Sequence, residues 1–463
     1  PGIFWDTACL ICNSSSDEEN TGDKVNYVKI SKTLSGLGRE TISTPNINEA
    51  QFGFAPDVNN NKIIFSLKAI SNINDVVARE IVNNRPYTSF DEFLTKMTEV
   101  KKKYNEAEED TEDDSEESNK KFKLSTVGIL NLIKAGAFDE FEDRQQLMQR
   151  YCSSVAKTIK NITSVQIPSL TSLGMFSDED LVYVKYFEFK KLLFVKENVV
   201  DKQGKSSTTW WYKITYYLSK YFVENILLYL KEDQYKEDDA GNYAVKRGAV
   251  EKAIDNICKN FKEKISQPKY LEAFNNSRFN EVYEKFECDE SISHHEIKTL
   301  GVYLHDHELT HVDYNRYNIT KYQDVPNIPI VEEEKQWGDR KIYIYELFRI
   351  CGTCLGVNKT KHVAYLLTPE DDIVTVKYYA GNFVHYNQKN SKEIDGKNVT
   401  VEESWFKRGT LLLISGIKRD DMFFAKSYKT SIFNNSTMKI TKVTEENELR
   451  VQEKRVGEDE CKD

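Results

Sequence analysis

The chain has 463 residues, of which 39% are hydrophobic and 30% are charged, and this length is enough for about three domains with ample core. No apolar run approaches the roughly 18 residues that a membrane span needs and no signal peptide opens the chain, so the sequence predicts an intracellular protein. The formal net charge of −10 argues weakly against nucleic acid as a partner, because binding phosphates requires local positive potential.

Residues 1–43 hold an apolar helix, a polar loop and a second apolar stretch at residues 27–31. The next block predicts a helix, a tight hairpin and a second helix over residues 64–93. Ala69 and Ile70 close its first apolar turn, and Asn72 and Asn74 are the non-glycine residues that best tolerate left-handed backbone. Such a hairpin can present backbone N–H groups and a helix N-terminus to a phosphate, whatever the base sequence.

A similar block follows after an acidic segment. Between Glu106 and Glu117 there are nine acidic residues and no basic one, so we expect residues 106–118 to form a solvated, disordered loop. A second apolar helix and turn then cover residues 129–139, with Gly136 in the turn and Arg144 beyond it.

Together the two blocks resemble the paired helix-hairpin-helix domain of the bacterial replicative DNA polymerase III alpha subunit, the family C polymerases. Residues 44–50 stand where that family has a "P-D-I-N-x-S" segment. The resemblance implies that residues 44–150 bind DNA and that residues 1–43 are the end of the fingers. The implied hairpin contacts are Lys68, Ser71, Asn72, Ile73, Asn74, Arg79, Lys134 and Gly136.

One departure from the family concerns the first hairpin, which usually contains glycines. This chain has Asn72 and Asn74 there, and asparagine keeps a side chain between the backbone and a phosphate. A compact helical linker domain without DNA contact is therefore the alternative interpretation of residues 44–150.

The resemblance fades over residues 151–289, apart from one short segment. Residues 172–176 stand where the family has a "Q-x-x-[LM]-F" peptide that inserts two apolar side chains into a sliding clamp. The resemblance thus implies a sliding clamp as a partner, bound through Ser172, Met175 and Phe176, although serine replaces the glutamine. The alternative is a loop that packs Met175 and Phe176 on its own domain.

The rest of this segment mixes aromatic residues with lysine. Such a mixture could stack bases. However, Tyr217, Tyr221, Ile226 and Leu230 recur at helical spacing, which more often indicates a buried face. We therefore predict a helical insertion, to which the sequence assigns no role.

Five of the seven histidines lie between residues 294 and 311. His305, His307 and His311 would place three imidazoles within two turns, so one hypothesis is a metal-dependent enzyme that uses this cluster. The resemblance gives another account. Residues 296–309 are similar to the family's "E-x-x-x-L-G-x-Y-L" helix and turn, which implies a connecting helix within residues 290–330 and ordinary structural histidines.

The eight cysteines are scattered, which is typical of a reducing compartment. Cys9/Cys12 and Cys351/Cys354 have C-x-x-C spacing, but neither pair has a second pair or a histidine at zinc-finger distance. Cys351 and Cys354 fall in a predicted strand, where side chains three residues apart point to opposite faces. We therefore expect no metal site at either pair.

From residue 341 the pattern changes to period-two alternation with turn signals. Five short strands are expected at residues 342–353, 362–368, 373–378, 409–416 and 422–426, with a longer insertion between the third and the fourth. This pattern predicts an OB-type barrel over residues 331–445, followed by a charged, frayed tail at residues 446–463. The family carries such a domain near its C-terminus.

Barrels of this class hold single strands by combining a basic groove with aromatic side chains on which bases stack. Residues 341–430 have fourteen Lys or Arg against ten Asp or Glu. Trp405 and Phe423 could equally fill the barrel core. The candidate contacts for single-stranded DNA are Lys359, Lys361, Lys377, Tyr379, Phe383, Lys407, Arg408, Lys418, Arg419 and Lys426.

The sequence therefore predicts an α+β multidomain chain with a helical paired helix-hairpin-helix domain, a helical insertion and a C-terminal OB-type β-barrel. The resemblance implies the C-terminal portion of a replicative DNA-directed DNA polymerase of phage type, which grips duplex and single-stranded DNA in the cytoplasm of a bacterial host. Because Pro1 replaces an initiator methionine, we expect a fragment of a longer chain.

Nucleotidyl transfer requires paired carboxylates that hold two Mg²⁺ ions. No palm motif carries them in these residues, so we name no catalytic residue and no cofactor, and we expect Mg²⁺ only in a palm on the rest of the chain or on a separate chain. The alternative is a stand-alone, non-enzymatic DNA-binding accessory protein.

Overall fold

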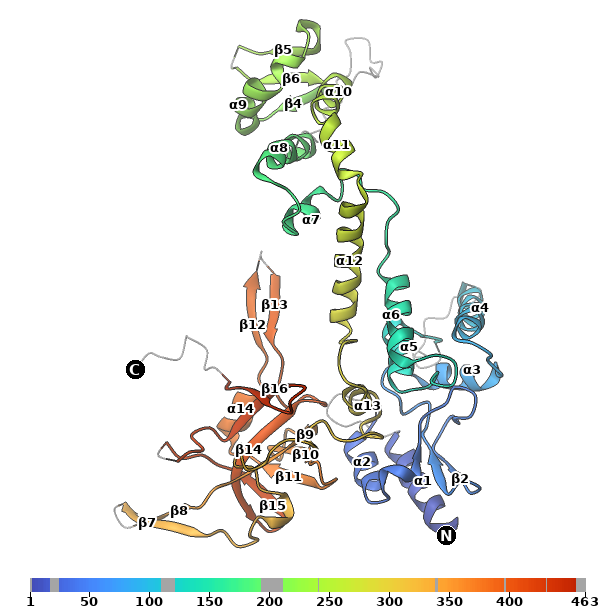
Figure 1. Ribbon diagram of the computed structural model, residues 1–463, viewed down its shortest axis with the longest axis vertical. Coiled ribbons are helices and arrows are strands. Elements are labelled where there is room, and N and C mark those ends of the chain that lie inside the picture. Colours follow the sequence, from blue (N-terminus) through green and yellow to red (C-terminus); the bar gives the residue numbers. More distant parts are fainter. Residues whose placement is uncertain are drawn as a thin grey trace. The chain divides into compact units, whose positions relative to one another are not determined.

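The computed structural model describes residues 2–16, 25–109, 121–192, 211–239, 241–337, 340–394, 397–429 and 431–454. The chain divides into two compact units (Figure 1). Unit 1 comprises Pro1–Gln149 and Phe286–Asp463, and it holds both hairpin blocks and the barrel. Unit 2 comprises Arg150–Lys285 and holds most of the segment expected to be an insertion.

Unit 1 begins with two helices and a small sheet. The helices are α1 (Gly2–Ser16) and α2 (Tyr27–Ser35), and a 3-10 turn (Arg39–Thr41) leads into the sheet. The strands are β1 (Ile42–Ser43), β2 (Ala55–Asp57) and β3 (Lys62–Ile64), and β3 pairs in parallel with β1 and antiparallel with β2. Helix α2 is amphipathic, so its apolar side faces the core.

The first hairpin block differs from the expectation in its first half. Residues 65–74 form successive turns, and the helix expected before the hairpin is wrong. The reason is tertiary: the N–H of Leu67 donates to the carbonyl of Gln51, and the hydroxyl of Ser66 donates to the carbonyl of Phe52. The second half is helical, with α3 (Asp75–Asn83) and α4 (Phe90–Glu109). Most of the expected acidic loop, from residue 110, lies outside the described residues.

The second block consists of α5 (Thr126–Lys134), a turn and α6 (Arg144–Val155). Gly136 has φ 84°, a left-handed conformation that glycine adopts without strain. The N–H of Ala137 donates to the carbonyl of Leu132, which closes the end of the helix as a C-cap does. The phenylalanines of both blocks pack together: the ring of Phe138 lies 4.9 Å from Phe90 and 5.0 Å from Phe93.

Unit 2 is not purely helical, because it also contains a three-stranded sheet. The strand order is β4-β6-β5, and both pairings are antiparallel. A core of aromatic and aliphatic side chains, including Phe187, Phe222 and Phe261, packs beneath the sheet. The strands are β4 (Trp211–Ile214), β5 (Tyr235–Glu237) and β6 (Tyr243–Lys246), and the helices are α7 (Ile167–Ser172), α8 (Asp178–Leu192), α9 (Tyr216–Asn225), α10 (Arg247–Ile257), α11 (Lys259–Ile265) and α12 (Pro268–Lys285).

The chain re-enters unit 1 through α13 (Ile292–Leu300). The hydroxyl of Ser291 caps its first turn by accepting from the N–H of His294, and Gly301 ends it with φ 73°. A side chain at Gly301 would collide with Tyr27 of α2, so α2 and this helix end approach closely. The connection expected over residues 290–330 contains one short α-helix, then turns and a 3-10 helix (Tyr322–Asp324).

The barrel consists of five strands that close into a ring. The strands are β9 (Phe348–Asn358), β10 (Val363–Leu367), β11 (Ile373–Lys377), β14 (Leu411–Arg419) and β15 (Met422–Ala425). The order around the ring is β9-β10-β11-β15-β14, and β14 pairs back to β9. Only the pairing of β11 with β15 is parallel among these five. This closed arrangement is consistent with an OB-type barrel.

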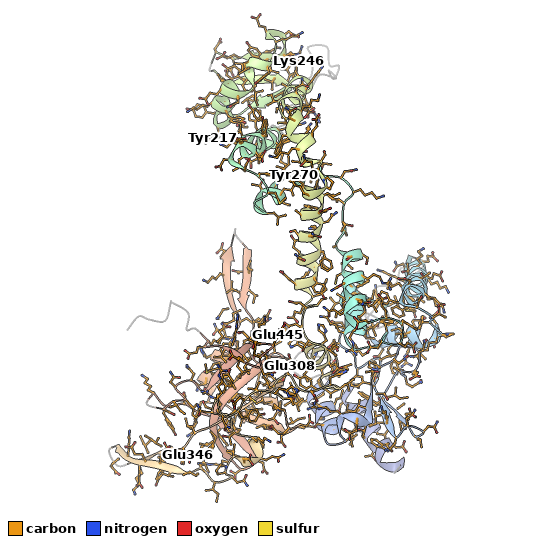
Figure 2. All side chains as sticks on the ribbon, in the orientation of Figure 1. Tyr217, Lys246, Tyr270, Glu308, Glu346 and Glu445 are labelled. Carbon is orange, nitrogen blue, oxygen red and sulfur yellow. The ribbon has the colours of Figure 1, made fainter. Side chains whose placement is uncertain are left out.

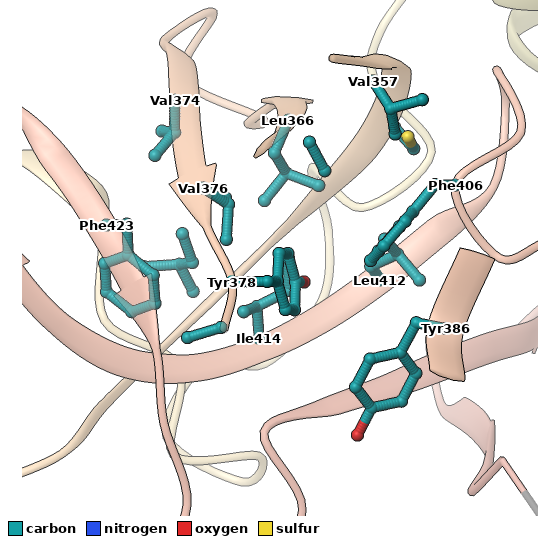
Figure 3. Close-up of a cluster of buried hydrophobic side chains, with 14 of the residues drawn as sticks. Val357, Leu366, Val374, Val376, Tyr378, Tyr386, Phe406, Leu412, Ile414 and Phe423 are labelled. Atoms are coloured by element: carbon teal, nitrogen blue, oxygen red, sulfur yellow. The ribbon is translucent and has the colours of Figure 1, made fainter. Parts of the chain in front are cut away.

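Inward-facing side chains fill the barrel, including Leu366, Val376, Leu412 and Phe423 (Figure 3). Trp405 is also fully buried in this core. The inward-facing positions of the strands alternate with outward-facing ones, as expected for a small barrel. Trp405 and Phe423 are therefore core residues, which was one of the two open interpretations.

Two strand assignments are corrected at the ends of this domain. The first barrel strand begins at Phe348, because residues 340–345 belong to β8 (Arg340–Tyr345), which pairs with β7 (Val331–Trp337). The expected frayed tail contains β17 (Leu449–Gln452), which pairs with β16 (Thr437–Val443) beside β14. The insertion between β11 and β14 holds α14 (Ala380–Asn387) and the hairpin of β12 (Asn390–Ile394) and β13 (Lys397–Glu402).

Candidate nucleic-acid interface

The first hairpin turn, residues 71–74, uses part of its backbone inside the protein. The N–H of Ser71 donates to the carbonyl of Thr299 at 3.0 Å, and the carbonyl of Ser71 accepts from Nδ2 of Asn131 at 2.8 Å. Both backbone groups of Ser71 are thus satisfied by α13 and α5. This position holds unit 1 together and does not offer its N–H to a phosphate.

The two asparagines of this turn have different roles. Asn72 is exposed and has φ 63°, so it takes the left-handed position expected of it. Asn74 has extended backbone and caps α3, because its Oδ1 accepts from the N–H of Val77 at 2.8 Å. Ile73 between them is buried. Asn72 is therefore the residue of the turn that faces solvent.

Two cations flank this turn in sequence and share one aromatic ring. The ammonium of Lys68 lies 5.1 Å and the guanidinium of Arg79 lies 4.0 Å from the ring centroid of Phe52. Lys68 is buried, whereas Arg79 is exposed. Arg79 can reach a phosphate from this position, and Lys68 serves the packing.

The second hairpin is closed to solvent. Lys134 is buried and its ammonium donates to the carbonyls of Phe286 and Glu287. The guanidinium of Arg144 lies directly against Gly136, leaving no space for a side chain there. Lys134 and Gly136, suggested as DNA contacts, are thus placed as structural residues.

The two hairpins are packed against each other. A Cβ atom at Gly128, in the first turn of α5, would lie only 3.1 Å from the carbonyl oxygen of Asn72. Asn131 of the same helix bonds Ser71. Gly128 therefore permits the close approach of α5 to the first hairpin turn.

Four of the suggested residues lie at one end of the barrel, called here the first-loop end. They are Lys359, Lys361, Lys377 and Tyr379. The ammonium of Lys377 donates to the carbonyl of Lys361, and the loop that carries Lys361 also bonds the end of β11. Lys359 and Lys361 are exposed, and the side chain of Tyr379 is 64% exposed. A basic edge with an open aromatic ring is therefore present at this end.

Phe383, suggested as a base stacker, lies in the core. It is 3% exposed and packs between Tyr378 and Phe406, with ring centroids 6.4 and 5.4 Å away. This position corrects its assignment, because a buried ring offers no face to a base. Helix α14 brings it inward, an effect that single-residue patterns do not reveal.

Lys418 and Arg419 lie at the opposite end of the barrel. They precede the turn between β14 and β15, and the parallel pairing of β15 with β11 puts that turn next to the start of β11. Lys418 is buried, with its ammonium 4.2 Å from the ring centroid of Tyr322. The expected single groove is thus divided between two ends.

Lys426 belongs to neither end group. Its ammonium lies 5.0 Å from the ring of Tyr345 on β8. Burial, and to a lesser degree the charge of Arg419, lower the pKa of Lys426. We therefore leave Lys426 outside the first-loop end.

Arg408 joins the barrel to the first hairpin. Its guanidinium lies 3.8 Å from the ring centroid of Tyr27 and donates to the hydroxyl of Ser71 at 2.7 Å and to the carbonyl of Lys298 at 3.0 Å. A guanidinium that stacks on a ring and donates hydrogen bonds in this way fixes the positions of the segments it contacts. Lys407 beside it is exposed.

Lys298 on α13 is a basic residue that the sequence did not suggest. Burial lowers the pKa of Lys298, and the nearby charges of Lys407 and Arg408 lower it further against the attraction of Glu287. Three cations therefore meet next to the first hairpin turn, opposed by the carboxylate of Glu287 at 3.2 Å from Lys298. No motif marks Lys298, because its position depends on how α13 packs.

The outer face of the first two barrel strands is covered. Leu355 of β9 and Leu367 of β10 pack against Val28 of α2 and Ile297 of α13. In OB-type barrels the face of the second and third strands commonly receives the oligonucleotide. Helices of unit 1 occupy part of that face here, so the first-loop end is the more accessible candidate.

The segment suggested for clamp binding lies in unit 2. Phe176 packs on its own unit, with its ring centroid 5.2 Å from Phe261 and 5.9 Å from Tyr270. Met175 is partly buried, and Ser172 is exposed with its hydroxyl donating to the carbonyl of Pro168. This arrangement matches the alternative of a packed loop.

The histidines do not form a metal cluster in the described part of the chain. His307 is buried and bonds the carbonyl of Leu367, Thr353 and the N–H of Leu309 through its two ring nitrogens. His305 bonds Glu296 at 2.7 Å. No group of three or more His, Cys, Asp or Glu side chains in the described residues could hold a metal ion, which corrects the hypothesis of a His305, His307 and His311 site.

The C-x-x-C pairs are also accounted for. Cys351 packs outside the barrel while Cys354 packs inside it, so the two point to opposite faces of β9. Burial raises the pKa of Cys354 to about 12 and of Cys9 to about 11. These thiols stay protonated at neutral pH, as is typical of inert structural cysteines.

Comparison with known proteins gives two kinds of result. Residues 40–109 match the family described as "Helix-hairpin-helix motif". Over 470 aligned positions the chain is 32% identical to "Probable DNA polymerase YorL" of Bacillus subtilis (strain 168) and to "DNA-directed DNA polymerase" of Bacillus phage SPbeta. The chain is thus similar to DNA polymerases of a bacterium and of a phage.

The similarity covers nearly all of this chain but only part of each relative. It covers 98% of this chain but 33% of each of those two proteins, so the chain spans about a third of the length of the curated relatives it matches. Among the helices that the structure describes, none is long and apolar enough to cross a membrane.

Proposed function

We propose that the chain is a DNA-holding portion of a DNA-directed DNA polymerase that acts in DNA replication. The names of the two relatives and the matched helix-hairpin-helix motif support this proposal. The observation that carries it is the first-loop end of the barrel, where Lys359, Lys361 and Lys377 lie on the loop and strand end beside the exposed Tyr379.

This end suits a single strand. Ammonium groups neutralise consecutive phosphates, and an exposed aromatic ring stacks on an unpaired base, which is worth about 1–3 kcal/mol per base. We place the duplex on the hairpin side of the same unit. That side carries the cluster of Lys298, Lys407 and Arg408 and the exposed Asn72 and Arg79.

The chemistry of nucleotidyl transfer is placed elsewhere. That reaction needs carboxylates that hold Mg²⁺, and the described residues contain no group of three or more His, Cys, Asp or Glu side chains that could hold a metal ion. We therefore assign no step of the reaction to these residues and place the palm on another part of the polymerase.

A sliding clamp remains a partner of this proposal through Ser172, Met175 and Phe176. Clamp binding requires Phe176 to leave its contacts with Phe261 and Tyr270. Retention of a clamp on beads that carry the purified chain, and its loss with Phe176→Ala, would support this contact.

The first prediction concerns the barrel lysines. Lys359→Ala together with Lys361→Ala should weaken binding to single-stranded DNA and reduce the salt slope by about 0.7 for every phosphate that the variant no longer neutralises. The measurement is fluorescence anisotropy of a labelled oligonucleotide across a salt series, with primed and duplex DNA in parallel.

The matched control is Lys101→Ala with Lys102→Ala, two exposed lysines on α4. This double variant should keep the affinity and the slope of the wild type. An unchanged slope in the barrel variant would place the single-strand site elsewhere, and no binding of any DNA by the wild type would reject the proposal.

A stand-alone accessory protein would bind DNA in the same way, so binding does not separate the two functions. Primer extension by the product of the complete natural reading frame does. Incorporation of nucleotides that falls with the barrel variant supports the polymerase, whereas binding without any incorporation supports the accessory protein.

A further inference from the structure

Unit 2 carries an open sheet face to which the sequence assigned no role. Residues directly opposite on antiparallel strands share a face of the sheet. On one face Tyr212, Ile214 and Val245 are buried in the core of unit 2. The other face, called here the Trp211 face, consists of Trp211, Lys213, Lys236, Ala244 and Lys246.

The Trp211 face combines one large ring with three lysines. The ammonium groups of Lys236 and Lys246 lie 4.7 and 5.9 Å from the ring centroid of Trp211. Lys213 and Lys236 are exposed, and none of the five members of the face is acidic. The face therefore combines an apolar ring with positive charge close to it.

A hollow of about 400 Å³ is lined by four members of this face, Trp211, Lys213, Lys236 and Ala244, and its volume is within the range of about 300–1,000 Å³ that is typical of ligand sites. Its rim also carries two carboxylates that oppose the charge of the lysines and are held in place by neutral groups: Asp238 accepts from the N–H and the Nδ2 of Asn242 at 2.8 and 3.1 Å, and Glu237 bonds Tyr243. Lys246 pairs with Asp233 at 3.2 Å, and because Asp233 is largely exposed this ion pair is weak and exchangeable.

Further aromatic surface follows the strand that carries Trp211. Tyr216 and Tyr217, at the start of α9, are 83% and 91% exposed, and Tyr217 and Lys246 both lie on unit 2 (Figure 2). Two adjacent aromatic side chains exposed to this degree indicate a binding surface more often than a packing role.

We propose that the Trp211 face binds single-stranded DNA, with an unpaired base stacked on Trp211 and the flanking phosphates near Lys213, Lys236 and Lys246. Stacking on a ring requires bases that are not already paired and stacked, so a duplex does not fit. An acidic peptide would satisfy the lysines but would leave the ring and the hollow unused.

We assign DNA as the ligand because the face presents ammonium groups and apolar surface, and none of its five side chains carries an acceptor to which a 2′-hydroxyl could donate. The proposal does not depend on the barrel, since the Trp211 face lies in a unit with its own core. It extends the DNA-holding role to the segment that the family resemblance does not cover.

The test uses the whole chain and an oligothymidine that carries one 5-iododeoxyuridine, with crosslinks located by mass spectrometry. We expect a crosslink within residues 211–217 or 235–246, in addition to any crosslink in the barrel. Lys236→Glu with Lys246→Glu should reduce the unit 2 crosslink about tenfold or more and leave the barrel crosslink unchanged. The same charge change at Lys220 and Lys252, exposed on helices of unit 2, is the control and should change neither crosslink.

Trp211→Phe keeps a ring and should keep most of the crosslink, whereas Trp211→Ala should abolish it, with far-ultraviolet circular dichroism confirming that each variant is folded. Absence of a unit 2 crosslink in the wild type would overturn the proposal. So would a crosslink that survives charge reversal, or a strong preference for oligouridine. Loss of only the barrel crosslink would count against the proposed function and not against the Trp211 face.

Discussion

Arg144 organises the second hairpin at the scale of single residues. Its guanidinium is buried, bonds Asp139 at 2.5 Å and the carbonyl of Lys134 at 3.0 Å, and lies 3.4 Å from the fully buried carboxylate of Glu296. A buried charge is tolerated only when it is paired and hydrogen-bonded in this way. Gly136 leaves the space in which this guanidinium sits.

Gly136→Ala should therefore destabilise unit 1 by about 2 kcal/mol or more. Left-handed backbone costs a residue with a Cβ about 1–2 kcal/mol, and the added Cβ would also displace Arg144 and meet Asp139. Urea unfolding measures the change. Gly381→Ala on α14, where nothing lies within 4 Å, is the control and should be close to neutral; equal stability of the two variants would contradict the role given to Gly136.

The buried histidine His307 makes stability depend on pH. Burial lowers the pKa of His307 to about 4, whereas a histidine in the unfolded chain titrates near pH 6.5. Between these values the unfolded state binds a proton that the folded state does not bind. The contribution of His307 to stability is therefore complete above pH 6.5 and falls as the pH decreases, by about 2 kcal/mol between pH 7 and pH 5.

His307→Asn tests this effect, because asparagine can keep a hydrogen bond to the N–H of Leu309 without titrating. The free energy of unfolding should fall less steeply between pH 7 and pH 5 in the variant than in the wild type. His311→Asn, at an exposed position, should keep the slope of the wild type. Equal slopes for wild type and His307→Asn would show that another group titrates.

At the scale of elements, the hairpins, α13 and the barrel are connected by an apolar contact and by a few ion pairs and hydrogen bonds. Val28 and Ile297 pack on the outer face of β9 and β10. Arg39 pairs with Asp371 at 2.7 Å, and Arg408 reaches from the barrel to Ser71. The first hairpin turn is therefore held by an element more than two hundred residues away in sequence.

Arg408→Lys should destabilise this junction almost as much as Arg408→Ala, by about 2–3 kcal/mol, because an ammonium cannot both stack on Tyr27 and bond Ser71 and Lys298. Faster hydrogen exchange at the amide of Ser71 would locate the effect. Arg419→Ala, at an exposed site, should change stability by less than about 0.5 kcal/mol. Full stability in Arg408→Lys would mean that charge alone matters there.

At the scale of the whole molecule, the chain contains two units with separate cores. The core of unit 2 is built from residues such as Val245 and Phe261, and the barrel core of unit 1 from residues such as Val376 and Phe423. Units with their own cores commonly unfold as separate cooperative transitions.

Calorimetry should therefore resolve two transitions. Val245→Ala should lower only the transition of unit 2 and Val376→Ala only that of unit 1, since each removes two fully buried methyl groups and costs about 2–3 kcal/mol. The two valines are matched in size and burial and serve as controls for each other. A single transition shifted by both variants would show that the units unfold together.

The sequence by itself determined the local features of this protein. Alternation of apolar residues placed the strands of the barrel, helical spacing placed α3 and α5, and the tolerance of asparagine for left-handed backbone placed Asn72. These features depend on neighbours within a few residues, so the sequence contains them directly.

Only the tertiary structure decided which basic residues face solvent. Lys68 and Lys134 are buried, Arg408 links the barrel to a hairpin, and Lys298, which no motif marks, lies among the cations of the junction. The exposure and partners of a long charged side chain depend on which distant segments pack around it, and local patterns do not encode that packing. The Trp211 face was also visible only in the tertiary structure, because it forms when strands that are separated in sequence by loops pair with each other.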